Sequence, residues 1–349
     1  MGESAVLAEV AQSSGDFSAA GTGPPDPDQP AWGPLAGVSV WVSSVVAIAI
    51  VPIIAVVVWY IISKARGAEV PGFQARDELI EWLKSPRLLL VQVASTLVAH
   101  AVTLALCWAV VTNLGTLRFW SSLGWHWAGH SKAGVNFMLL GMAIGFGPLL
   151  IAILARLISP RLGVIPLELL YPIAFLATAI GLAMAWRRLR PAGITSEQQV
   201  TPLWYWVVFS ACVIVTLVGV TQVLSRFLPQ SEENAFTELL KSSREVRVAI
   251  AVLATFSAPI VEEVIYRGVL FSALRSRTGV APAVVLVTML FAGVHFLQYW
   301  GAWVTISGLI FLSLILTLVR ARTGSILPSV TIHFVNNAFF SLLIVANKG

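Results

Sequence analysis

Three ionisable residues lie inside a long apolar stretch, in the segment APIVEEVIYRG at residues 258–268. Glu263 and Arg267 are four residues apart, so on a helix they share one face and can form an ion pair. Glu262 points about 100° away from Glu263. A charged side chain in the middle of a bilayer is costly and marks a functional site by default. Glu262 therefore needs a partner from another part of the chain.

Two histidines and an asparagine occupy later apolar segments. His295 lies in MLFAGVHFLQYW, and His333 and Asn337 are one helical turn apart in SVTIHFVNNAFF. A carboxylate and two imidazoles can activate water, either with Glu262 as general base or by holding a metal ion. Two histidines and one glutamate are a known catalytic zinc set. Asn337 can donate to an oxyanion or serve as an interhelical hydrogen-bonding residue. The set is suited to hydrolysis of a carbonyl compound such as a peptide bond.

The remaining polar residues of the apolar stretches have expected structural roles. Glu263 and Arg267 neutralise each other and fix their helix, as buried charges require. Pro259 removes a backbone donor and kinks the helix, so it leaves carbonyls that need other partners. We expect His100 to be a packed or pore-facing histidine and Glu168 to reach the membrane interface.

The elements that carry these residues are predicted to be membrane helices. Of the 349 residues, 57% are hydrophobic and 11% are charged, whereas a soluble protein is about 25% charged. Apolar runs of about 20 residues recur, and backbone groups in lipid must pair within their own segment. We predict an all-α, polytopic membrane helix bundle with about nine transmembrane helices and an all-helical catalytic core. The predicted spans lie near residues 38–62, 88–112, 135–155, 165–186, 203–225, 246–272, 281–299, 303–319 and 327–346.

The chain divides into three parts. Residues 1–36 are rich in Gly, Ser, Pro and acids and contain no Lys or Arg, which predicts a disordered N-terminal tail. Residues 37–199 hold the N-terminal transmembrane helices, and residues 200–349 hold the catalytic core. Two polar connections, at 63–87 and 226–247, are each predicted to contain an interfacial helix.

Charge and cysteine content limit the partners. The net charge of +5 is spread over the connections between apolar runs, which is typical of membrane-flanking Lys and Arg and not of a nucleic-acid surface. Cys107 and Cys212 lie in apolar runs and are expected to be buried thiols. The two halves of the chain favour opposite orientations, and the sequence specifies no oligomeric state. We expect a multi-pass protein of the plasma membrane whose partners are the lipid bilayer and a peptide or membrane-protein substrate, with no nucleic acid.

Three motifs resemble those of a known family. EEVIYR (262–267) fits Glu-Glu-x-x-x-Arg, FAGVH (291–295) fits Phe-x-x-x-His, and HFVNN (333–337) fits His-x-x-x-Asn. Their order and spacing resemble the CAAX prenyl protease and bacteriocin-processing family of intramembrane proteases, also called the Abi family. The resemblance covers about residues 200–346.

This resemblance implies a multi-helix membrane protein that cleaves peptide bonds. The residues that it assigns to the site are Glu262, Glu263, Arg267, His295, His333 and Asn337. It implies that Glu262, His295 and His333 activate water, that Asn337 binds the oxyanion, and that the other two residues support them. The family is usually described as metalloproteases, so a divalent metal, zinc by preference, would be held by Glu262, His295 and His333. A glutamate-dependent mechanism without metal is the alternative.

Two other functions use intramembrane charges. A proton-coupled transporter employs Glu, His and Arg relays but predicts matching inverted repeats, whereas the polar residues here are concentrated in the last third of the chain. A non-catalytic immunity or scaffold protein on the same fold is the second alternative, and the intact motifs argue against it. The sequence has no HExxH, GxSxG or GxGD motif, so other protease mechanisms have no visible residues to perform them.

Overall fold

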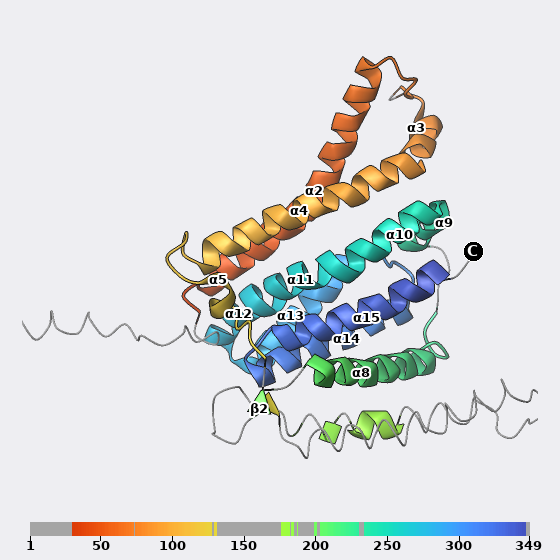
Figure 1. The fold of residues 1–349 in the computed structure, drawn as a ribbon. Helices are drawn as coiled ribbons and strands as arrows, with labels where there is room; N and C mark the ends of the chain where they lie inside the picture. Colours follow the sequence, from red (N-terminus) through yellow and green to blue (C-terminus); the bar gives the residue numbers. More distant parts are fainter. Residues whose placement is uncertain are drawn as a thin grey trace, which may run out of the picture.

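The computed structural model describes residues 30–72, 74–127, 129–130, 176–181, 183–184, 187, 199–200, 203–229 and 234–346. This part of the chain is a helix bundle (Figure 1). Its β-structure is a two-residue antiparallel pair, in which β1 (Gly129–His130) pairs with β2 (Gln199–Val200). The predicted all-α membrane fold is therefore confirmed.

Six helices in the described ranges are long and apolar enough to cross a membrane. They are α2 (Pro34–Ala65), α4 (Pro86–Val111), α8 (Leu203–Leu224), a continuous helix at Arg244–Thr278, α14 (Trp303–Thr323) and α15 (Leu327–Ala346). A further apolar helix, α13 (Val280–His295), has 16 residues and is shorter than a typical span. These helices match seven of the predicted spans. The span predicted at 135–155, and most of that at 165–186, lie outside the described residues.

Three short helices lie in the connections before and after the long ones. Helix α3 (Arg76–Leu83) and helix α9 (Ala235–Ser242) occupy the two polar connections, where the sequence predicts helices. Helix α5 (Phe119–Ser122) follows α4. The chain is a multi-pass membrane protein, with α2 and α4 packed along each other and α3 at their far end (Figure 1).

The helix Arg244–Thr278, here called the composite helix, contains two π-helical segments. Its segments are α10 (Arg244–Val252), the π-helical η1 (Leu253–Ser257), α11 (Ala258–Glu263), the π-helical η2 (Val264–Leu270) and α12 (Phe271–Thr278). Single π turns inside α-helices are rare and occur frequently at functional sites. The motif EEVIYR spans the junction between α11 and η2.

Pro259 explains the hydrogen bonding at η1. The amide of Ala258 donates to the carbonyl of Leu253, five residues back, as π-helical pairing requires. The next carbonyl, that of Ala254, would need an amide at position 259, and proline has none. This confirms the expectation that Pro259 leaves a carbonyl in need of another partner.

The core packs the composite helix against its neighbours. Val264, Leu270 and Phe271 are buried together with residues of α2, α4 and α13. Gly37 of α2 lies at a close crossing, because a Cβ at this position would be 2.7 Å from the Cβ of Ala273 in α12. A glycine therefore allows α2 to approach the composite helix directly.

The ordered N-terminal segment begins earlier than predicted. Trp32 is 5% exposed and donates its indole N–H to the carbonyl of Val269 in η2 at 3.0 Å. The prediction of disorder is therefore wrong for residues 30–36, and residues 1–29 lie outside the described part. A tryptophan combines a large apolar surface with one hydrogen-bond donor, so it can bury itself and pair a backbone carbonyl at once.

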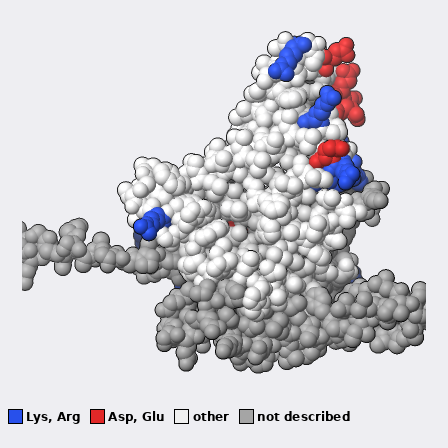
Figure 2. All heavy atoms as spheres, in the orientation of Figure 1, with Lys and Arg blue, Asp and Glu red and all other residues white. Residues whose placement is uncertain are grey.

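The surface is consistent with a lipid environment. In the view of Figure 2, Lys, Arg, Asp and Glu gather near the far end of the α2–α4 pair, and the broad middle carries few of them apart from a small acidic spot. Large apolar side chains such as Ile53, Val57 and Ile61 of α2 are exposed. Exposed apolar surface of this extent marks contact with lipid or a partner.

Candidate active site

The predicted ion pair is present and completely buried. Arg267 Nη1 donates to Glu263 Oε1 at 2.9 Å, and both side chains are 0% exposed. Helix α14 binds the rest of the guanidinium, because Nε donates to Thr317 Oγ1 at 3.3 Å. Arg267 Nη2 donates to the carbonyl and Oγ of Ser313 at 3.0 and 2.8 Å. Helix α14 thus fixes the arginine that neutralises Glu263.

His333 of α15 connects the two adjacent glutamates. Its Nδ1 lies 2.9 Å from Glu263 Oε1, which is an acceptor, so Nδ1 carries the proton. In the neutral imidazole Nε2 would then hold the lone pair, and it lies 3.8 Å from Glu262 Oε2. That distance is too long for a direct hydrogen bond. The sequence argument paired Glu263 with Arg267 alone, whereas the structure gives Glu263 a second partner in His333.

His295 joins the cluster through an aromatic ring. Its Nδ1 bonds to the carbonyl of Phe291, one turn earlier in α13, at 2.9 Å. The Phe291 ring lies 5.0 Å from the His295 ring and 6.1 Å from the His333 ring, centroid to centroid. The Arg267 guanidinium lies 4.9 Å from the centre of the same ring, within cation–π range. Among these described residues, no hydrogen bond or ion pair joins His295 to Glu262 or His333.

The predicted three-ligand metal set is not assembled. Both imidazoles donate through Nδ1 and leave Nε2 as a ligand atom, an arrangement that second-shell oxygens impose on metal-binding histidines. Within the described ranges, however, no three His, Cys, Asp or Glu side chains are grouped closely enough to hold one ion. Glu262 and His333 lie together and His295 does not share their contact.

Asn337 supplies the partner that Pro259 removes. Its Nδ2 donates to the carbonyl of Ala254 at 2.8 Å, and its Oδ1 accepts from Asn336 Nδ2 at 3.3 Å. The Ala254 carbonyl is the one that lacks a π-helical donor because position 259 is proline. One N–H of the Asn337 amide thus has a structural partner in the Ala254 carbonyl.

Two residues near Glu262 were not among the predicted site residues. His100 of α4 is 6% exposed, lies 2.7 Å from Ser257 Oγ through Nδ1, and interacts electrostatically with Glu262. Tyr299 also interacts electrostatically with Glu262, and its ring stacks beside that of His295 at 6.5 Å. Tyr299 lies in the turns after α13, four residues after His295, and its N–H donates to the carbonyl of His295 at 3.1 Å.

A second buried arginine was also missed. Arg320 of α14 is 0% exposed, and its Nε donates to the carbonyl of Arg267 at 3.2 Å. In the sequence it belongs to VRAR, near a predicted span end, which resembles a membrane-flanking basic cluster. The sequence feature that could have predicted a buried Arg320 is its spacing from Ser313 and Thr317, which places three polar residues on one face of an apolar helix.

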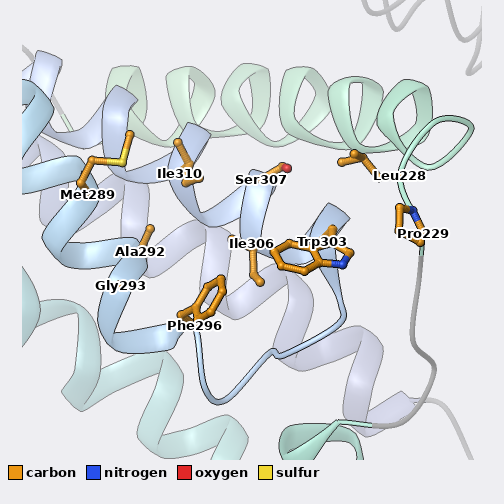
Figure 3. Close-up of a pocket in the computed structure, with 10 residues that line it drawn as sticks. All are labelled: Leu228, Pro229, Met289, Ala292, Gly293, Phe296, Trp303, Ile306, Ser307 and Ile310. Atoms are coloured by element: carbon orange, nitrogen blue, oxygen red, sulfur yellow. The ribbon is translucent and has the colours of Figure 1, made fainter.

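An apolar groove lies along α13 and is lined by none of the residues of the polar cluster. It has a volume of about 520 Å³ and runs between α13, α14 and the residues after α8 (Figure 3). Helix α13 contributes Met289, Ala292 and Gly293, and Phe296 follows directly after its last residue. His295 is not among the lining residues, so the groove is separate from the polar cluster.

The polar cluster falls within the part of the chain that matches a known family. Residues 244–339 match the sequence model of the family described as type II CAAX prenyl endopeptidase, Rce1-like. The match begins at the first residue of the composite helix, ends within α15 and includes all six predicted site residues. The resemblance of the motifs is thereby confirmed over this segment. No curated protein and no solved structure matches the chain.

Proposed function

We propose that the protein is an intramembrane endopeptidase in which Glu262 and His333 activate a water molecule. The observation that carries the proposal is the 3.8 Å approach of Glu262 Oε2 to His333 Nε2, next to the buried Glu263–Arg267 pair. The match to a family of CAAX-type membrane endopeptidases supports hydrolysis as the reaction.

The geometry suits one bridging water. Glu262 Oε2 and His333 Nε2 are both acceptors, and polar atoms separated by more than 3.5 Å are suited to bridging through water. The water oxygen attacks the peptide carbonyl carbon while Glu262 accepts a water proton as general base. As the C–N bond breaks, Glu262 returns this proton to the leaving amine. His333, oriented by Glu263, holds the water in line.

The other motif residues have secondary roles in this proposal. Phe291 contacts both imidazole rings, which supports a place for His295 at the edge of the same site. We assign His295 to orienting water or substrate. The second N–H of Asn337 is assigned to the oxyanion, since its first N–H is bonded to Ala254.

A divalent metal such as zinc, if held by Glu262, His295 and His333, would supply a Lewis acid for the carbonyl. The arrangement of these side chains does not provide a three-ligand group, so the proposed steps do not use one. Elemental analysis of the purified protein, compared with the Glu262→Gln variant, tests the prediction: metal bound in equal molar amount by the wild type alone would support it.

Cleavage of a defined peptide tests the proposed activity. The substrates are an internally quenched peptide ending in a CAAX sequence, farnesylated and unlipidated, and the enzyme is the full chain in detergent. Loss of a general base lowers the rate by at least about 100-fold, and we expect this for Glu262→Gln. Glu245→Gln, at an exposed position of the same composite helix, is the matched control and keeps the wild-type rate.

Other outcomes identify the alternatives. Unchanged cleavage by Glu262→Gln would remove this residue from the mechanism. Solute flux into liposomes that depends on a pH gradient, without peptide cleavage by the wild type, would favour a proton-coupled transporter. Complementation of a deletion strain by Glu262→Gln would favour a non-catalytic immunity or scaffold protein.

A further inference from the structure

We infer that Arg320, which lies outside the three motifs, is a positioning residue of the catalytic site. The inference concerns the backbone of η2, on which Arg267 is placed, and for its kinetic readout it rests on the proposed function. Arg320 contacts none of the proposed reacting atoms, so its effect is transmitted through Arg267.

The end of η2 leaves one carbonyl in need of a donor. The amide of Phe271 donates to the carbonyl of Tyr266, five residues back. In the α-helical spacing of α12 that follows, Ser272 is four residues from Gly268. When the backbone hydrogen bonds change from five-residue to four-residue spacing, the carbonyl of Arg267 therefore receives no backbone N–H. A buried carbonyl without a donor is unfavourable, so this junction requires a side chain from elsewhere.

Arg320 supplies that donor and a second contact across the junction. Its Nε donates to the carbonyl of Arg267 at 3.2 Å, and its Nη2 donates to Ser272 Oγ at 3.0 Å. Its guanidinium also lies 5.8 Å from the centre of the Phe271 ring. The rigid fork of an arginine can bond to two acceptors at fixed separation, whereas a lysine presents one flexible ammonium group.

A continuous series of contacts leads from Arg320 to the proposed base. Arg320 binds the carbonyl of Arg267, and the side chain of Arg267 binds Glu263. Glu263 accepts from His333 Nδ1, and His333 Nε2 faces Glu262. Because α14 also binds the Arg267 guanidinium, one helix fixes both the backbone and the side chain of this residue. A displacement of about 1 Å at such a site can cost about 100-fold in rate.

Enzyme kinetics and histidine NMR on the full chain test this role. For Arg320→Met we expect kcat on the CAAX peptide to fall about 100-fold with little change in KM. The ¹⁵N resonance of His333 Nδ1, assigned with a His333→Gln sample, should lose the signature of a proton bonded to a carboxylate. Arg322→Met, two residues later on the same helix and outside the Ser313, Thr317, Arg320 face, should leave both readouts unchanged.

A second variant keeps the test valid if Arg320→Met does not fold. Arg320→Lys retains the charge and one donor group, and we expect kcat and the His333 resonance to lie between those of the wild type and a full loss. Wild-type kcat and an unchanged His333 resonance in Arg320→Lys or Arg320→Met would overturn the inference. If Glu262→Gln stays active, the proposed function fails, and the NMR readout alone then decides the positioning role of Arg320.

Discussion

Glu263, and not its neighbour, is the most heavily contacted carboxylate of the cluster. One of its oxygens accepts from both Arg267 and His333 at 2.9 Å. Its role is therefore double, because it neutralises a buried arginine and selects the tautomer of a histidine. Glu262, with a side chain that is 20% exposed, has the access to substrate and water that a general base needs.

Removing the charge of Glu263 should affect folding as well as rate. We expect Glu263→Gln to lower the free energy of unfolding by about 3–5 kcal/mol, because Arg267 would be left buried without its counter-charge. Denaturant or thermal unfolding in detergent measures this change, with Glu245→Gln as the control. The pair Glu263→Met and Arg267→Met, made together, should be less destabilised than Glu263→Gln. If the double variant were less stable than Glu263→Gln, an unpaired buried charge would not be the cause of the destabilisation.

Residue spacing predicted part of this cluster. The four-residue separation of Glu263 and Arg267 predicted their pairing correctly. The contact of His333 with Glu263 was not predictable, because it depends on the relative rotation of two helices that are 70 residues apart in the chain. Arg320 and Trp32 were missed for a different reason: each donates to a carbonyl of η2, and this π-helical segment is not visible from residue types alone.

Two apolar helices hold the composite helix through polar faces. Along α15, His333, Asn337 and Ser341 recur every four residues, and Ser341 Oγ accepts from Thr255 Oγ1 at 3.1 Å. Along α14, Ser313, Thr317 and Arg320 bind η2 and its end. Interhelical hydrogen bonds of this kind position membrane helices where the hydrophobic effect between helices is weak.

A double-mutant cycle can test whether the Asn337 amide compensates for the backbone N–H that Pro259 lacks. We expect Asn337→Ala alone to lower the free energy of unfolding by about 1–3 kcal/mol, since it leaves the Ala254 carbonyl unpaired. Pro259→Ala restores a backbone N–H, so Asn337→Ala should cost less in that background. The coupling, measured by unfolding in detergent, is the difference between the two costs. Equal costs in both backgrounds would show that Asn337 does not compensate for the proline.

The described helices have two polar ends. At one end Lys84 bonds to Glu238 of α9 at 3.5 Å. At the other, Ser325 Oγ donates to the carbonyl of His126, and Ile326 N–H donates to the carbonyl of Gly124 at 3.1 Å. The bundle architecture followed from composition and span length, whereas its orientation did not, because basic residues flank both ends.

Cysteine labelling tests this arrangement of ends. Lys241→Cys in α9 and Arg277→Cys in α12 are at exposed positions near opposite ends of the bundle. In sealed vesicles we expect a membrane-impermeant maleimide to modify one of them from outside and the other only after lysis. Cys107 and Cys212 are buried, so the maleimide should label these native cysteines only weakly. Modification of both positions from the same side would contradict the fold described here.

The contact between Trp32 and Val269 shows that the family-matched segment is not structurally independent of the N-terminal residues. The family-matched segment, residues 244–339, contains every motif, yet a carbonyl of its composite helix is bonded to an indole more than two hundred positions upstream. Gly37 adds a close crossing against the same helix. A transplant of the matched segment into another membrane scaffold would carry the reactive groups without these supports. The segment recognised by the family model is thus smaller than the set of residues that contacts its first helix, and minimal versions of the protein should begin upstream of Trp32.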